Sequence, residues 1–257
     1  MQVYSASDTD FPAFVLSHGV TIHGLQFVAW NLREQPTAYY SRHSGAGLTY
    51  KVVSAAGPVK MGVIGLGTGT MAAYGRAGDQ IRFYEIDPKV LKIAKTEFSY
   101  LADSKAKVDV VEGDARLMLA EEPAQQFDIL VVDAFSSDAI PTHLLTREAF
   151  QLYWRHLKPD GVLAMHVSNH YLDLGPVVEL GNQALGKDIW QVICTKDEPG
   201  DTEPYNSTYI LVSSRKDFFK SKEFDQRLSI IEMPKKLKMW TDEYTTLWPI
   251  FRVKGDL

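Results

Sequence analysis

The stretch Lys60-Met-Gly-Val-Ile-Gly-Leu-Gly-Thr-Gly-Thr70 decides the fold that this sequence predicts. Residues 61–64 form an apolar run of the kind found in buried strands of parallel sheets. Gly65, Gly67 and Gly69 follow directly, and glycine allows both a tight turn and the close approach of a ligand to the backbone. The stretch therefore predicts a strand that ends in a ligand-binding turn.

The residues after this turn complete a nucleotide-binding unit. A helix is predicted over residues 71–76, with its N-terminal N–H groups facing the turn, and a second strand over residues 81–84. Glu85 ends that strand twenty residues after Gly65, where such units place the carboxylate that binds the ribose hydroxyls. Glycine-rich turns also occur for structural reasons, but the strand, helix and acid around this one favour a nucleoside site. The Gly-x-Gly-x-Gly spacing favours S-adenosylmethionine over NAD.

The rest of the chain alternates between strand-like and helix-like segments. This rhythm predicts an α/β fold with a doubly wound, mostly parallel sheet of seven strands. Before it, short β-rich pieces and a glycine turn in residues 11–30 predict a small hairpin or meander. We therefore divide the chain into a small N-terminal β domain, residues 1–55, and a Rossmann-like nucleoside-binding catalytic domain, residues 56–257.

The composition limits the classes of function. The 257 residues include 27 Lys and Arg and 32 Asp and Glu, a net charge of −5, and no basic cluster dense enough to indicate a nucleic-acid partner. Cys194 is the single cysteine, which excludes an internal disulfide and a cysteine metal cluster. No apolar run reaches the roughly 20 residues that span a bilayer. We expect a cytoplasmic enzyme or the cytosolic domain of a membrane protein.

Carboxylates end three successive predicted strands beside the glycine turn. Asp114 follows the third strand and Asp133 the fourth, in addition to Glu85 after the second. Ligands of open α/β sheets bind at the carboxyl ends of the strands, so these acids are expected in one site. An ionised carboxylate only accepts hydrogen bonds, and Asp114 is therefore placed at the exocyclic amine of an adenine. Asp133 is placed at the reacting end of the ligand.

These residues resemble the spermidine synthase family of polyamine aminopropyltransferases. They are most similar to the spermidine-synthase-like domains that bacteria often fuse to membrane-spanning regions. The matching pieces run in order over nearly the whole chain: His23-Gly-Leu-Gln26, Pro36-Thr-Ala-Tyr-Tyr40, Gly65-Leu-Gly-Thr-Gly69, Glu85-Ile-Asp87, Gly113-Asp-Ala115, residues 133–138 and Trp240-Thr-Asp-Glu-Tyr244.

The resemblance implies a fold and an activity. A small N-terminal β domain would precede a methyltransferase-like Rossmann domain. The enzyme would be a transferase that moves an aminopropyl group from decarboxylated S-adenosylmethionine to a polyamine such as putrescine, releasing 5′-methylthioadenosine. The donor is a co-substrate, and neither a metal nor another cofactor is expected. A homodimer is expected, with a fused or partner membrane region as a further expectation.

The resemblance also implies roles for single residues. Gln26 and Tyr40 would face the substrate cleft. Asp133 and Asp138 would contact the amine, and Asp133 would help to deprotonate it. Tyr205, in a Pro-Tyr pair before the last strand, is a further candidate for the amine site. The positions assigned to the nucleoside donor are Gly65, Gly67, Thr68, Gly69, Glu85, Asp114 and Ala115.

Two departures from the family pattern leave the donor and the amine open. Thr68 stands where established spermidine synthases carry an Asp, and Asp133 and Asp138 are separated by four residues instead of two. An S-adenosylmethionine-dependent methyltransferase on the same fold and a non-catalytic nucleoside- or polyamine-binding module remain alternatives. The histidines lack the spacing of metal ligands, and His166, inside a predicted strand, is interpreted as a satisfied core or cleft histidine.

Overall fold

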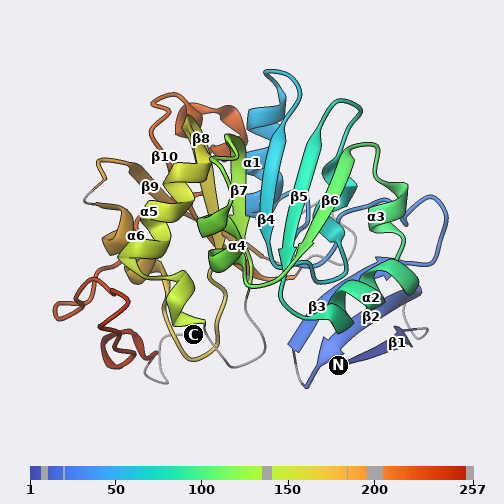
Figure 1. The fold of residues 1–257 in the computed structure, drawn as a ribbon, viewed down its shortest axis with the longest axis horizontal. Helices are drawn as coiled ribbons and strands as arrows, with labels where there is room; N and C mark the ends of the chain where they lie inside the picture. Colours follow the sequence, from blue (N-terminus) through green and yellow to red (C-terminus); the bar gives the residue numbers. More distant parts are fainter. Residues whose placement is uncertain (7–10, 20, 135–140, 184, 196–204, 253–257) are drawn as a thin grey trace.

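The computed structural model describes residues 1–6, 11–19, 21–134, 141–183, 185–195 and 205–252. Within these residues the chain forms a small antiparallel sheet and a larger mixed sheet covered by helices on both faces (Figure 1). None of the helices in this described part is both long and apolar enough to span a bilayer.

The elements follow one another in βα order after the small sheet. The small sheet contains β1 (Gln2–Ala6), β2 (Ala13–His18) and β3 (Thr21–Phe27). The large sheet contains β4 (Lys60–Ile64), β5 (Gln80–Glu85), β6 (Lys107–Glu112), β7 (Phe127–Val132), β8 (Leu157–His166), β9 (Asp188–Cys194), β10 (Ser207–Ser213) and β11 (Leu228–Ser229). The α-helices are α1 (Gly45–Ser54), α2 (Pro88–Thr96), α3 (Tyr100–Asp103), α4 (Ala115–Glu121), α5 (Arg147–His156) and α6 (Gly175–Gln183). The 3₁₀ helices are η1 (Thr70–Tyr74), η2 (Thr142–Leu144), η3 (Phe218–Lys220), η4 (Lys222–Phe224) and η5 (Trp248–Ile250).

The order of strands in the large sheet is β11-β9-β10-β8-β7-β4-β5-β6. Neighbours from β8 to β6 are parallel, whereas β10 is antiparallel to both β8 and β9. Within the described residues the sheet therefore has eight strands, one more than the sequence predicts. The additional strand, β11, is two residues long and pairs with β9, which is too short for any periodicity to reveal.

Two apolar cores lie on opposite faces of the large sheet. Met61 and Val63 of β4 belong to the core under α1 and α2, whereas Ile64 belongs to the core under α4, α5 and α6. Successive side chains of a strand point to opposite faces, so a strand covered on both faces reads as a continuous apolar run. This arrangement explains why the run in residues 61–64 does not alternate, and Figure 1 shows the helices on the two faces.

Acidic residues at strand ends also begin the following helices. The carboxylate of Asp87 accepts a hydrogen bond from Lys89 N–H at the start of α2, where Pro88 occupies the first helical position. Asp114 does the same for α4 through Leu117 N–H. Such N-caps satisfy backbone donors that the helix leaves unpaired, and they fix the helix starts close to the carboxyl ends of β5 and β6.

The small sheet packs directly against the glycine-rich turn. A Cβ atom added to Gly24 of β3 would lie 2.5 Å from Thr68 Oγ1, and one added to Gly67 would lie 2.8 Å from the carbonyl oxygen of His23. The next helix, α1, packs against the large sheet, where Gly45 approaches Tyr209 of β10. The division of the chain at residue 55 stays a prediction. Helix α1 belongs to the predicted N-terminal domain, but its side chains contribute to the core of the large sheet.

The segment after the glycine turn differs from the predicted helix. A helix was predicted over residues 71–76, and the structure has the shorter 3₁₀ helix η1 over Thr70–Tyr74. Gly69 is left-handed before it, and Gly75 is extended after it, so only five residues remain between the two glycines. A segment this short forms few α-helical hydrogen bonds, and the tighter 3₁₀ turn is common in such connectors.

Candidate active site

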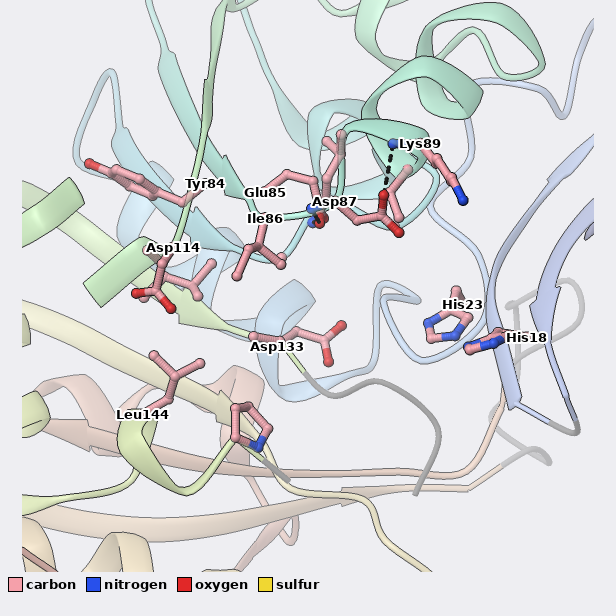
Figure 2. Close-up of a pocket in the computed structure, with 18 of the residues that line it drawn as sticks. His18, His23, Tyr84, Glu85, Ile86, Asp87, Lys89, Asp114, Asp133 and Leu144 are labelled. Atoms are coloured by element: carbon pink, nitrogen blue, oxygen red, sulfur yellow. Dashed lines mark hydrogen bonds between the residues drawn. The ribbon is translucent and has the colours of Figure 1, made fainter. Parts of the chain in front are cut away.

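A cavity of about 610 Å³ lies where β4, β5, β6 and β7 end. Its volume is in the range of pockets that hold small-molecule ligands. The predicted site residues that line it are Tyr40, Gly65, Gly67, Glu85, Asp114, Ala115 and Asp133. Figure 2 shows Asp133 between Asp114 on one side of the cavity and His23 on the other. The structure thus brings together the three acids that follow successive strands.

Gly65 turns the chain directly over the end of β7. Its φ is +95°, its N–H donates to the carbonyl of Tyr84 at 2.9 Å, and Asp133 N–H donates to the carbonyl of Ile64 at 2.8 Å. A Cβ atom at Gly65 would lie 2.0 Å from the carbonyl oxygen of Asp133. Only glycine fits here, because both the backbone angle and the space exclude a side chain.

Glu85 is buried at the end of β5, and its carboxylate is hydrogen-bonded to the backbone of the glycine turn. Its Oε2 accepts the N–H of Leu66 at 3.0 Å, and its Oε1 accepts the N–H of Asp87 at 2.8 Å. Burial raises the pKa of Glu85, against the lowering effect of these donors. A carboxylate has about four acceptor positions, and backbone N–H groups of Leu66, Asp87 and Ile86 bond to Glu85, so it can still accept a hydroxyl from a ligand in the cavity.

Asp114 combines two contacts at the opposite side of the cavity. Its Oδ1 caps α4 by accepting Leu117 N–H at 3.0 Å, and its Oδ2 lies 3.2 Å from His143 Nε2. Ala115, the first residue of α4, lines the cavity beside it. His143 is also a lining residue, and its pairing with Asp114 is not evident from the sequence, where the two lie 29 positions apart.

The carboxylate of Asp133 is buried and has a partner at each oxygen. The hydroxyl of Tyr40 donates to Oδ2, and Nδ1 of His166 lies 2.8 Å from Oδ1. Burial alone would raise the pKa of Asp133, but His166, Tyr40 and His23 outweigh it and hold the pKa below its usual value. Burial and the charge of Asp133 raise the pKa of Tyr40 well above its usual value. At neutral pH, Asp133 is therefore ionised and Tyr40 is a neutral donor.

Aromatic rings surround this carboxylate. His166 lies between Tyr39, with ring centroids 4.7 Å apart, and Tyr209, at 5.0 Å. Its Nε2 is 2.8 Å from Ser168 Oγ. Tyr39 also contacts Tyr40, at 4.6 Å between centroids. The faces of aromatic rings attract cations, so a buried carboxylate beside tyrosines suits a protonated amine.

Gln26, which was predicted to face the substrate cleft, lies in a hydrogen-bond network at the end of β3. Its Nε2 donates to the carbonyl of Arg33 at 2.9 Å and to Ser99 Oγ at 2.8 Å, and its Oε1 accepts Ser99 N–H at 2.8 Å. Gln26 is buried but is not among the described residues that line the cavity. Its amide instead ties the end of β3 to the segment before α3, because these contacts use both its donor and its acceptor.

Three further predicted residues do not line the cavity within the described part of the chain. Thr68 is buried, with its Oγ1 2.7 Å from Thr70 Oγ1. Gly69 packs against Leu101, and Tyr205 packs against the apolar core of the small sheet. Asp138 lies outside the described residues. Among those that are described, no group of three or more His, Cys, Asp or Glu side chains is arranged to hold a metal ion.

The sequence shows a family relationship over half of its length. Residues 56–184 match the family described as "Spermine/spermidine synthase domain". A polyamine aminopropyltransferase from Vibrio vulnificus (strain CMCP6) is 33% identical over 129 residues, which are 48% of this chain and 41% of that protein. A probable polyamine aminopropyl transferase from Bifidobacterium longum (strain NCC 2705) is 31% identical over 154 residues, 54% of this chain and 31% of that protein. The matched part thus spans less than half the length of these curated relatives.

Solved structures share the fold at low sequence identity. A probable spermidine synthase from Corynebacterium glutamicum ATCC 13032 has a TM-score of 0.60 at 18% identity, over 88% of this chain and 84% of that one. Human methyltransferase-like protein 13, solved in complex with SAH, has a TM-score of 0.51 at 18% identity, over 79% and 96%. The predicted methyltransferase-like Rossmann fold with a small N-terminal sheet is confirmed.

Proposed function

This chain belongs to the spermine/spermidine synthase domain family, and we propose that it is a polyamine aminopropyltransferase. The donor is decarboxylated S-adenosylmethionine, the acceptor is a polyamine such as putrescine, and the second product is 5′-methylthioadenosine. The observation that carries this proposal is the buried, ionised carboxylate of Asp133, which lies in the cavity beside Tyr39 and Tyr40. The names of the two aminopropyltransferase relatives support the same reaction type.

The donor's nucleoside occupies the side of the cavity between Glu85 and Asp114. Glu85 accepts hydrogen bonds from the ribose hydroxyls, and Gly65 and Gly67 let the donor approach the turn. Asp114 accepts a hydrogen bond from the adenine amine. The supporting geometry is that both carboxylates line the cavity while their other contacts are backbone N–H groups and His143.

The amine binds at Asp133 and attacks the carbon next to the sulfonium. A C–N bond forms, the C–S bond breaks, and its electron pair leaves on sulfur, which becomes the neutral thioether of methylthioadenosine. The nitrogen must lose a proton to attack. Asp133 holds the ammonium by charge and accepts this proton, a contribution of about 10²–10⁴-fold for a positioned general base. Holding amine and sulfonium in line supplies the remainder.

Tyr40 serves the amine site by holding the carboxylate of Asp133, as its hydrogen bond to Oδ2 supports. Asp138 stays assigned to contacting the amine and holding its charge, as predicted from the resemblance. A homodimer and a cytoplasmic location also stay predictions, which the molar mass in solution and the full reading frame test.

Replacing Glu85 tests the nucleoside position. We expect Glu85→Ala to weaken methylthioadenosine binding by about 1.5–3 kcal/mol, since hydrogen bonds to a charged group are lost, as measured by calorimetric titration. Glu112→Ala is the matched control, because Glu112 is an exposed acid at the end of the neighbouring strand β6 and does not line the cavity. Equal affinity of the Glu85 and Glu112 variants would show that the ribose binds elsewhere.

A methyltransferase on the same fold is the second candidate, favoured by Thr68, whose buried hydroxyl replaces the acid of the family's glycine turn. Incubation with putrescine and either decarboxylated or intact S-adenosylmethionine separates the two. We expect methylthioadenosine to accumulate with the decarboxylated donor and an amine. S-adenosylhomocysteine from the intact donor would indicate a methyltransferase, and neither product would indicate a binding module.

A further inference from the structure

His166 is the residue of the candidate site whose role the sequence does not predict. It ends β8, and its side chain is 8% exposed. Each ring nitrogen has a partner, Asp133 Oδ1 at Nδ1 and Ser168 Oγ at Nε2, both at 2.8 Å. The stacked rings of Tyr39 and Tyr209 hold its two faces. The imidazole is therefore fixed in position directly behind the carboxylate that meets the amine.

The hydrogen bonds around Ser168 are compatible with a neutral imidazole that carries its hydrogen on Nδ1. Ser168 Oγ accepts the backbone N–H of Thr208 at 2.8 Å, and its own hydrogen can be donated to Nε2 of His166. When Nε2 is the acceptor, Nδ1 carries a hydrogen that it donates to Asp133 Oδ1. In this state His166 is neutral and Asp133 keeps a full negative charge, which a protonated amine requires.

We propose that His166 is a positioning residue that sets the charge Asp133 presents to the amine. Neutral His166 orients the carboxylate through its Nδ1–H. A proton added at Nε2 turns the pair into an imidazolium and a carboxylate, whose charges cancel, so the cation of the substrate loses its counter-charge. This role rests on the proposed function, since it places the amine at Asp133.

The tyrosines placed around the imidazole do not change charge near neutral pH. Burial raises the pKa of Tyr39, Tyr40 and Tyr209 well above the usual value, and Cys194 lies behind Tyr209 as a buried thiol. Asp133 and His23 are two further titratable groups at this site. The pKa of Asp133 is below its usual value despite burial, and burial lowers the pKa of His23.

Putrescine binding at two pH values measures this effect without turnover. The protein is saturated with methylthioadenosine and titrated with putrescine in a calorimeter at about pH 8 and about pH 6, a range in which primary amines stay protonated. We expect the wild-type affinity to fall by about 10- to 100-fold at the lower pH, the range that hydrogen bonds to charged groups contribute.

Two substitutions at His166 separate orientation from charge. His166→Asn places an amide N–H near the position of Nδ1 but cannot be protonated, so affinity near the wild-type value should persist at both pH values. His166→Phe keeps a stacked ring and removes the donor, so affinity should be low at both. His156→Gln is the control, because His156 is a buried histidine of α5 that does not line the cavity. It should keep the wild-type pH dependence.

Wild-type pH dependence in His166→Asn, or equal wild-type affinity at both pH values, would contradict this role of His166. So would the absence of putrescine binding at either pH. Thermal unfolding of each variant shows whether it is folded. If His166→Phe does not fold, the comparison of His166→Asn with the wild type still tests this role. A wild-type protein that binds putrescine with the expected pH dependence but releases no methylthioadenosine would refute the aminopropyl transfer and leave this role intact.

Discussion

Asp133→Asn should lower kcat by about 10²–10⁴-fold while the affinity for methylthioadenosine stays within a few-fold. The substitution keeps the shape of the side chain and a group that can bond to Tyr40 and His166, but it removes the charge and the proton acceptor. Nucleoside affinity should survive because Glu85 and Asp114 line a different part of the cavity. Steady-state kinetics with saturating amine, together with calorimetric titration of methylthioadenosine, measures both quantities.

The matched control is Asp128→Asn. Asp128 lies near the start of β7, the strand that Asp133 follows, and its carboxylate bonds to Lys158 Nζ and to the N–H of Lys60 instead of facing the cavity. We expect its turnover to match the wild type. Raising the pH should partly rescue Asp133→Asn, because more of the amine then arrives unprotonated. Turnover at the wild-type rate in Asp133→Asn would exclude the mechanism given above.

Gly65→Ala should be the most destabilising single substitution in the site. The new Cβ atom would meet the carbonyl oxygen of Asp133 at 2.0 Å with a φ of +95°, and both partners are backbone atoms of paired strands that cannot move apart cheaply. Left-handed strain and overpacking each cost about 1–3 kcal/mol, so the free energy of unfolding should fall by about 2–6 kcal/mol. Methylthioadenosine binding should be lost. Denaturant unfolding and calorimetry measure these effects.

Gly57→Ala separates the strain from the collision. Gly57 also has a positive φ, +143°, but an added Cβ atom would meet nothing within 4 Å. Its cost should be confined to the backbone conformation, about 1–2 kcal/mol, with nucleoside binding intact. Equal destabilisation by the two substitutions would show that the turn relaxes around the added methyl group.

The large sheet and its acids were predictable because local patterns determine them. Apolar runs such as residues 129–132 indicate strands covered on both faces, and the carboxyl ends of parallel strands meet at one edge of a sheet. Glu85, Asp114 and Asp133 therefore had to converge once the strands were recognised. The structure places all three around one cavity.

Other features depend on contacts that no local pattern contains. The amide of Gln26 bonds to Ser99, which is 73 residues distant. His166 was interpreted as a satisfied histidine, and it is one, but its partner is the carboxylate at the end of the neighbouring strand. The 3₁₀ helix η1 is shorter than the predicted helix because Gly69 and Gly75, which flank it, limit its length. One feature of the sequence could have indicated this contact. His166 lies near the carboxyl end of the predicted strand that follows, along the chain, the strand before Asp133.

Transfer of a labelled aminopropyl group tests the central claim most directly. The full chain is incubated with putrescine and decarboxylated S-adenosylmethionine that carries ¹³C in the aminopropyl carbons, and the products are analysed by mass spectrometry. We expect the label in the extended polyamine, in amounts equal to the methylthioadenosine released, and neither product above background with Asp133→Asn. Label that stays in the donor, or methylthioadenosine without labelled polyamine, would contradict aminopropyl transfer at this site.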